Sequence, residues 1–202
     1  MKEAIRHFVV EKAREVFGEK GYSSTTIEDI ANASEISKPT LYNYFSGKDD
    51  IFRSVIKLSN DEFEELINPV VYGHEEFPEK LRILTYEILQ HMNKNRGLLK
   101  IAFHESHMFI EAIDNDQSGG FHKILESKVK TVKKMKEFFQ EGVRKGHIKK
   151  DIPVELIAVF YTGIIGEFSL SYILGKEKMA NFDLNQITYH ITNILSKGIF
   201  KK

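Results

Sequence analysis

The chain has 202 residues, of which 42% are hydrophobic, so it can bury a core in one small and one medium helical unit. It has no cysteine, which excludes disulfides, thiol nucleophiles and cysteine zinc sites; no apolar run follows Met1 to suggest a secretory signal, so the cytoplasm is the expected compartment. Its 29 basic and 29 acidic residues cancel, so bulk charge does not predict binding to nucleic acid.

Two helices are predicted before residue 34. The first ends before Gly21, where a left-handed C-cap is expected, and carries apolar residues at helical spacing: Ile5, Val9, Ala13, Val16 and Phe17. The second is short and begins at Thr25, because Glu28 lies three residues later and completes a capping box. It ends at Ala33 after one apolar face formed by Ile27, Ile30 and Ala31.

A third helix is predicted over residues 38–45, after a four-residue turn at residues 34–37. Ser37 can cap this helix, and Pro39 falls in its first turn, where the amide has no helical partner. Leu41 and Phe45 face inward, because helices this short are stable only when packed. The outer side and its rims carry groups that donate to phosphates and base edges, namely Lys38, Thr40, Tyr42, Asn43 and Tyr44.

The rest of the chain shows helical periodicity and no strand-like alternation. A long helix is predicted over residues 48–67, stopped by Pro69, with a loop over residues 69–78. Further helices follow, separated by polar segments and by a break at Asn93, Asn95 and Gly97; they cover residues 81–92, 98–113, 121–145, 153–174 and 184–200. The predicted fold class is all-α, with about nine helices in total.

The most hydrophobic segment, residues 152–175, is predicted to be a buried helix. Its charge-free part, residues 156–166, is eleven residues long and is bracketed by Glu155 and Glu167. A membrane span needs about 18 to 20 apolar residues, so no membrane partner is expected.

The first fifty residues resemble the TetR family of one-component bacterial regulators. The resemblance rests on Ala13, Phe17, Gly21, Tyr22, Thr25, Thr26, Ile30, Ala31, Ala33, Ile36, Ser37, Thr40, Leu41, Tyr42, Tyr44, Phe45 and Lys48. Two positions depart from the family pattern. Glu35 stands where the family often has glycine in the turn, so a non-glycine residue is expected to adopt a left-handed backbone, and Pro39 replaces a frequent glycine on the recognition helix.

The resemblance implies a three-helix helix-turn-helix DNA-binding domain over residues 1–47. A larger helical ligand-binding and dimerisation domain is expected over residues 48–202. By the same resemblance, the phosphate contacts are Thr26, Tyr42, Tyr44 and Lys48, and the residues that face bases in the major groove are Lys38, Pro39, Thr40 and Asn43. The electrostatic attraction of this domain to DNA phosphates is expected to be weak, because residues 1–50 hold seven basic and nine acidic residues. Within it, residues 36–48 contain two lysines and no acid, so the attraction depends on a few placed groups.

The recognition helix, predicted over residues 38–45, is short and attracts DNA weakly, so two copies about one DNA turn apart are needed for tight binding. A homodimer on a palindromic operator of double-stranded DNA is therefore expected. The helices at residues 153–174 and 184–200 are the candidates for the dimer interface. Their candidate residues are Phe160, Gly163, Ile164, Phe168, Ile191, Ile194 and Leu195. An internal core hairpin is the alternative for the same two helices.

The resemblance further implies a ligand-responsive transcriptional regulator, a repressor released from its operator by a small apolar or amphipathic effector. The candidate effector contacts are Tyr86, Phe103, His104, His107, Met108, Tyr161 and Glu167, because such cavities combine an apolar lining with a few polar anchors. The alternative is a family-like protein that acts mainly through a protein partner, with DNA binding secondary.

Other interpretations of the sequence are weaker. His104, Glu105, His107 and Glu111 lack the spacing of a zinc-protease helix and are better explained as core or cavity groups, so no metal or other cofactor is predicted. The basic stretch at residues 123–150 is better explained as a solvated helix face than as a second nucleic-acid patch. No phosphate loop or acid, base and nucleophile set supports an enzyme.

Overall fold

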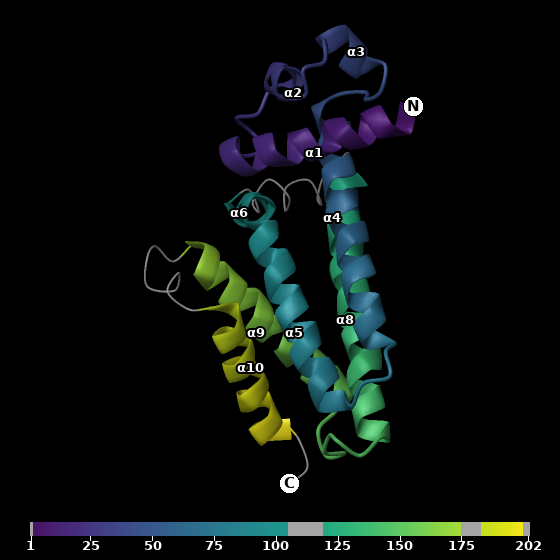
Figure 1. The fold of residues 1–202 in the computed structure, drawn as a ribbon, viewed down its shortest axis with the longest axis vertical. Helices are drawn as coiled ribbons and strands as arrows, with labels where there is room; N and C mark the ends of the chain where they lie inside the picture. Colours follow the sequence, from purple (N-terminus) through teal and green to yellow (C-terminus); the bar gives the residue numbers. More distant parts are fainter. Residues whose placement is uncertain (1, 105–118, 175–182, 200–202) are drawn as a thin grey trace. The chain divides into compact units, whose positions relative to one another are not determined.

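The computed structural model describes residues 2–104, 119–174 and 183–199, and these residues form nine helices (Figure 1). They are α1 (Lys2–Lys20), α2 (Ile27–Ala33), α3 (Lys38–Tyr42), α4 (Lys48–Val71), α5 (Phe77–Lys94), α6 (Arg96–His104), α8 (Gly119–Arg144), α9 (Val154–Leu174) and α10 (Leu184–Ile199). The all-α prediction is confirmed. The chain folds as two compact units, and α4 runs from the first into the second.

Unit 1 comprises Met1–Glu62 and Asn95–Leu125. Helix α1 packs against α2 and α6, and α2 packs against α3. The apolar faces predicted from periodicity meet in one core, whose buried members include Val9, Ala13, Phe17, Ile30, Leu41, Phe45, Ile51, Val55, Leu98 and Ile101. This core supports the two short helices α2 and α3, which could not be stable in isolation.

Gly97 lies inside α6, where the sequence predicts a helix break. A Cβ atom at Gly97 would approach the Cα atom of Gly18 in α1 to 2.4 Å. The predicted break between the two helices is confirmed at Asn95, between the end of α5 and the start of α6. Gly97 itself is not part of the break, and it is explained by the close packing of α6 on α1.

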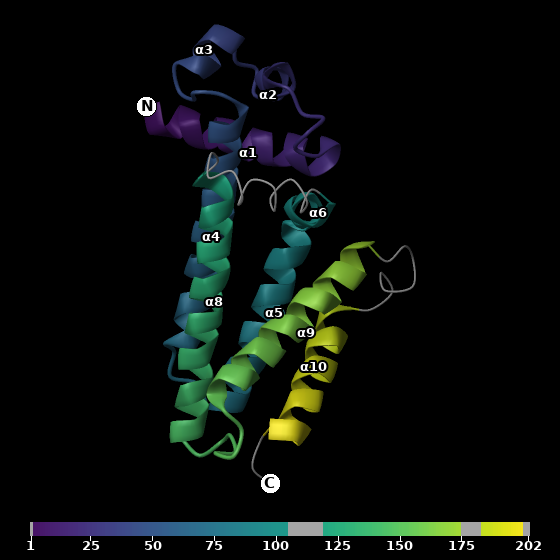
Figure 2. The ribbon, with the colours of Figure 1, turned by 180° about the vertical axis from the view of Figure 1, so that it is seen from behind.

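Unit 2 comprises Phe63–Lys94 and Glu126–Lys202. Helix α5 packs against α9 and α10, and the C-terminal part of α4 lies beside α8 in both views (Figures 1 and 2). Four aromatic rings contact one another in its core, those of Phe77, Phe138, Phe139 and Tyr161. The hydroxyl oxygen of Tyr161 lies 3.0 Å from that of Thr85, which satisfies both polar groups inside this apolar cluster.

The boundaries of α4 and α5 differ from the prediction at two prolines. Helix α4 continues through Pro69 and ends two residues later, at Val71. Helix α5 begins at Phe77, so Pro78 lies in its first turn, where no amide hydrogen is needed. The loop is therefore shorter than residues 69–78, and the buried Lys80 donates to the carbonyl oxygens of Val71 and Gly73 across it.

Helix α9 contains most of the apolar segment 152–175, but it is buried on one side only. Ile157, Tyr161 and Ile165 are buried in the core of unit 2, whereas Val159 and Phe160 are more than half exposed. The expectation of a buried helix is thus correct for one face. Among the described residues, no helix combines the length and apolar character that a membrane span requires.

Candidate nucleic-acid interface

Helix α2 begins with a capping box, but its residues are Thr26 and Asp29. The Thr26 hydroxyl accepts from the Asp29 amide at 3.1 Å, and the Thr26 amide donates to the Asp29 carboxylate at 2.9 Å. The predicted pair of Thr25 and Glu28 is wrong by one residue, because Thr25 is buried and its hydroxyl donates to the carbonyl of Gly21. The capping position therefore places Thr26 at the exposed start of α2.

Asp29 also receives the side chain of Lys20, whose amine lies 2.6 Å from the carboxylate. Hydrogen bonds from Lys20 and Thr26 lower the pKa of Asp29 to about 2. The carboxylate thus stays charged and remains a partner for both groups at neutral pH.

The turn between α2 and α3 contains the left-handed residue that the sequence predicts. Glu35 has φ 53°, and the amide of Ile36 donates to the carbonyl of Ala31 at 3.0 Å. A glycine would adopt this conformation without steric cost. Glu35 has a Cβ atom and still adopts the left-handed conformation, in a turn that backbone hydrogen bonds hold together.

Helix α3 begins as predicted, with Ser37 as its N-cap and Pro39 in its first turn. It ends at Tyr42, however, and the predicted extension to residue 45 is wrong. The amides of Tyr44 and Phe45 both donate to the carbonyl of Leu41, so a hydrogen-bonded turn closes the helix. Leu41 and Phe45 are buried, which anchors both the helix and this turn in the core of unit 1.

Burial of these two anchors leaves the opposite surface of α3 open to solvent. Lys38, Pro39, Tyr42 and Asn43 are exposed, and the exposed fraction of Tyr42 is 57%. Thr40 is half-buried, and its amide and hydroxyl both contact Ser37. The predicted contact surface is therefore exposed along most of its length.

Two of the predicted phosphate contacts have additional roles within the protein. Tyr44 is half-buried against the core of unit 1. The amine of Lys48 donates to the carbonyl oxygens of Tyr22 at 3.0 Å and Thr25 at 2.9 Å, and it lies 4.5 Å from the centre of the Tyr22 ring. Lys48 thus fastens the segment that precedes α2, a role that the sequence motif does not reveal.

Arg6 holds the C-terminal end of α3, and sequence reasoning did not identify it. Its guanidinium donates to the carbonyl of Tyr44 and, at 3.0 Å, to the hydroxyl of Ser54. It also lies 3.5 Å from the carboxylate of Asp50 and 4.2 Å from the centre of the Phe45 ring. Arg6 therefore ties α1 and α4 to the turn that follows the recognition helix.

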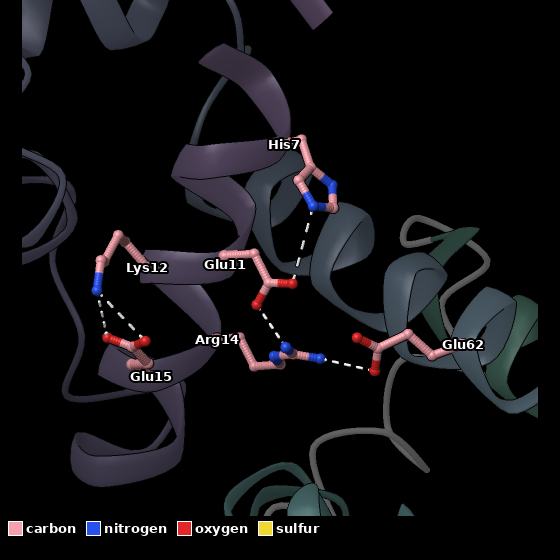
Figure 3. A network of polar contacts seen from close by, with 6 residues as sticks. All are labelled: His7, Glu11, Lys12, Arg14, Glu15 and Glu62. Carbon is pink, nitrogen blue, oxygen red and sulfur yellow. Dashed lines mark hydrogen bonds and ion pairs between the residues drawn. The ribbon is translucent and has the colours of Figure 1, made fainter. Parts of the chain in front are cut away.

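A second arginine of α1 fastens that helix to α4 (Figure 3). Arg14 contacts Glu11 of its own helix, and its Nη1 atom lies 2.8 Å from the carboxylate of Glu62 in α4. Lys12 and Glu15 form a separate pair at 3.0 Å within α1. The arginine therefore links two helices of unit 1, whereas the lysine links none.

Lys38, the predicted contact to guanine, forms an ion pair with Glu28 of α2. Both side chains are exposed, at 47% for Lys38 and 63% for Glu28. The sequence assigns Glu28 to a capping box, so this contact is an additional finding. It places a carboxylate on the surface that is predicted to face DNA.

The candidate dimer residues divide into two groups. Phe160, Gly163, Ile164 and Ile194 are exposed on α9 and α10, with Ile194 at 69%. Ile191 and Leu195 are buried in the core of unit 2, and Phe168 packs against that core. Leu156 and Val159 of α9 and Tyr189 of α10 are further exposed apolar residues of these two helices.

The candidate effector contacts are placed only in part. Tyr161 is buried, Tyr86 is half-buried and Glu167 is exposed. The side chains of Phe103 and His104, and all of His107 and Met108, lie outside the described residues, as do Glu105 and Glu111 of the metal alternative.

Comparisons with known proteins agree with this architecture. The model of the tetR family of bacterial regulatory proteins matches residues 9–55, which include α2, α3 and the start of α4. The fatty acid metabolism regulator protein of Bacillus subtilis (strain 168) is 24% identical over 96% of this chain and 95% of its own length.

Solved structures match almost the whole fold. The fatty acid degradation regulator FadR from Bacillus halodurans gives a TM-score of 0.77 at 21% identity, over 96% of this chain and 95% of that one. AibR, solved in complex with isovaleryl coenzyme A and operator DNA, gives a TM-score of 0.72 at 17% identity, over 94% of this chain and 97% of that one. The helix-turn-helix of this chain thus resembles that of the tetR family of bacterial regulatory proteins, and its all-helical fold resembles that of the solved regulators.

Proposed function

We propose that this protein is a ligand-responsive transcriptional repressor that binds a palindromic operator as a homodimer. The observation that carries the proposal is the exposed surface of α3, formed by Lys38, Pro39, Tyr42 and Asn43 above the buried anchor Leu41. A capped helix with a buried inner face and exposed polar side chains outside has the form that the major groove admits. Residues 1–47 are the proposed DNA-binding domain and residues 48–202 the proposed ligand-binding and dimerisation domain.

The proposed DNA contacts have two roles. Thr26, Tyr42, Tyr44 and Lys48 bind phosphates, which fixes the register of the protein on the duplex without reading its sequence. Lys38, Pro39, Thr40 and Asn43 face the bases, where a good contact contributes about 1 to 3 kcal/mol of discrimination. The position of Thr26 at the start of α2 and the exposure of Lys38 and Asn43 support this division.

The exposed apolar surface of α9 and α10 supports the proposed dimer. Phe160, Ile164 and Ile194 are exposed there, and a Cβ atom added at Gly163 or Gly166 would meet open space within 4 Å. A second copy packed on this surface would bury these side chains and could approach closely at the glycines. Two recognition helices held together in this way would bind DNA far more tightly than one.

Two of the similar proteins support a proposal for the class of effector. The relative in Bacillus subtilis regulates fatty acid metabolism, and AibR binds isovaleryl coenzyme A. We therefore propose an acyl coenzyme A as the amphipathic effector, with its acyl chain held by residues 48–202. Tyr86, Phe103, His104, His107, Met108, Tyr161 and Glu167 remain the proposed contacts.

Release from DNA then follows from thermodynamic linkage. An effector that favours a different separation of the two recognition helices weakens operator binding. By linkage, DNA weakens effector binding by the same factor. A coupling of about 1 to 3 kcal/mol corresponds to roughly 5- to 150-fold release. Helix α4 is the proposed lever, because it is continuous from unit 1 into unit 2.

Fluorescence anisotropy on a labelled duplex selected by the protein tests the proposal. A long-chain acyl coenzyme A should release the duplex, whereas free coenzyme A should not. Release by neither compound would reject the effector class and leave the DNA-binding function standing. Failure to select any duplex would reject the DNA-binding function and favour action through a protein partner.

A further inference from the structure

The ion pair between Glu28 and Lys38 joins the two helices of the helix-turn-helix on their exposed side. Glu28 comes from the first turn of α2, and Lys38 is the first residue of α3. Neither side chain is needed for the core, because both are exposed and the capping of α2 is completed by Thr26 and Asp29. The pair is therefore required neither for the core of unit 1 nor for the cap of α2.

The other lysines of this region are also engaged within the protein. Lys20 pairs with Asp29, and Lys48 donates to backbone carbonyls. In the free protein, each of these three amines already has an oxygen partner. Lys38 is the one whose partner is an exposed carboxylate on the proposed DNA surface.

An ion pair changes what a lysine can offer to DNA. The carboxylate cancels the charge of the ammonium, and this charge provides the sequence-independent attraction to phosphate. The carboxylate of Glu28 leaves hydrogen-bond donors of Lys38 available, because an ammonium carries three N–H groups and one of them is enough to bind Glu28. The remaining two can still donate to the O6 and N7 acceptors of guanine.

We propose that Glu28 is a specificity-determining residue, which suppresses the binding of Lys38 to arbitrary DNA while leaving its hydrogen bonds to a cognate base. The proposal rests on the proposed function, because it assumes that α3 enters the major groove. It assigns to α2 a role in discrimination, in addition to its role in positioning α3.

The variant Glu28→Gln tests the proposal against the matched variant Glu35→Gln. Both remove one negative charge from the helix-turn-helix, but only the first breaks the ion pair with Lys38. Both variants should raise the affinity for a scrambled duplex, and the increase should be about two- to fivefold larger for Glu28→Gln than for Glu35→Gln. This ratio corresponds to the coupling free energy of an exposed ion pair. The plot of log affinity against log salt should also steepen, by up to about 0.9.

The same comparison on the selected duplex separates specificity from general attraction. Glu28→Gln should lower the ratio of selected to scrambled affinity, whereas Glu35→Gln should raise both affinities alike and keep the ratio. In a Lys38→Met background, Glu28→Gln should behave like Glu35→Gln, because no amine is left to release. Equal effects of the two variants, or a Glu28→Gln effect that persists without Lys38, would overturn the proposal.

The two proposals fail in different ways. If the wild-type protein enriches no sequence, the proposed function is wrong, and the comparison on the scrambled duplex at low salt still measures whether Glu28 restrains Lys38. If a sequence is enriched but the ratio does not change, only the role of Glu28 is wrong.

Discussion

The amine of Lys80 lies 2.9 Å from the carboxylate of Glu141, and the Lys80 side chain is 1% exposed. The same amine also donates to the carbonyl of Val71 at the end of α4, so this contact joins α4, α5 and α8 within unit 2. A buried ammonium that loses its carboxylate is strongly destabilising. Lys80 and Glu141 therefore fix the C-terminal end of the proposed lever.

Glu141→Ala should lower the free energy of unfolding by about 3 kcal/mol, because it leaves the ammonium of Lys80 buried without its counter-charge. Lys145→Ala is the matched control, since Lys145 pairs with the same carboxylate but is 47% exposed; its cost should stay below about 1 kcal/mol. Urea denaturation of the two variants measures the difference. Equal costs would show that the buried contact contributes no more than the exposed one.

The same carboxylate predicts a dependence on pH. Burial alone would raise the pKa of Glu141, but hydrogen bonds from Lys145 and Lys80 outweigh it and hold the pKa below the ordinary 4.5. A depressed folded pKa stabilises the protein above the unfolded value, and this contribution disappears as the pH falls through the folded value. The difference in free energy of unfolding between wild type and Glu141→Ala should therefore decrease in acid, below pH 4.5. A difference that stays constant with pH would show that the charged carboxylate of Glu141 does not stabilise the fold.

Arg6→Ala should weaken binding to the selected duplex by about tenfold, or roughly 1.4 kcal/mol, because the turn after α3 loses its tie to α1 and α4. Lys12→Ala removes an equal charge from α1 but breaks only the pair with Glu15, so it should change affinity by less than about twofold. Titrations of both variants by anisotropy, with circular dichroism to verify folding, provide the comparison. If Lys12→Ala lowered the affinity for the selected duplex as much as Arg6→Ala, the effect would come from the lost charge alone.

Lys38→Ala should relax base preference at one operator position, whereas Lys48→Ala should weaken all sequences alike. The difference follows from their proposed partners, a base edge for Lys38 and a phosphate for Lys48. Binding to a panel of single-base operator variants measures both profiles. Uniform loss on every duplex with Lys38→Ala would remove Lys38 from the base-contacting group.

Ile194→Glu should give a monomer with operator affinity lowered by about a hundredfold or more, because the second recognition helix is lost. Ile194 is 69% exposed, so the charge does not enter the core of unit 2. Val129→Glu places the same charge on an exposed apolar residue of α8 and should leave the protein dimeric. Sedimentation velocity distinguishes the two outcomes, and a dimeric Ile194→Glu would place the interface elsewhere.

Local signals made most of the helix-turn-helix predictable. The cap at Ser37, the proline in the first turn and the inward positions of Leu41 and Phe45 depend on neighbours within a few residues, and the structure contains all of them. The start of α2 was ambiguous for a physical reason. Thr25 and Thr26 each precede an acid by three residues, and burial of Thr25 decides between them.

Contacts between distant segments could not be predicted from spacing. Arg6 with the Tyr44 carbonyl, Lys80 with Glu141 and Gly97 with Gly18 all depend on how helices pack against each other. Sequence patterns identify an apolar face but do not indicate which polar group ends beside which carbonyl. The same limit explains why the pairing of Lys38 with Glu28 became visible only in the structure.

Selection from a random duplex library with the purified wild-type protein tests the central claim most directly. A palindromic motif should be enriched, with two half-sites about one helical turn apart, roughly 34 to 36 Å between their centres. A library that returns no enriched motif would contradict the proposal that the exposed surface of α3 recognises DNA.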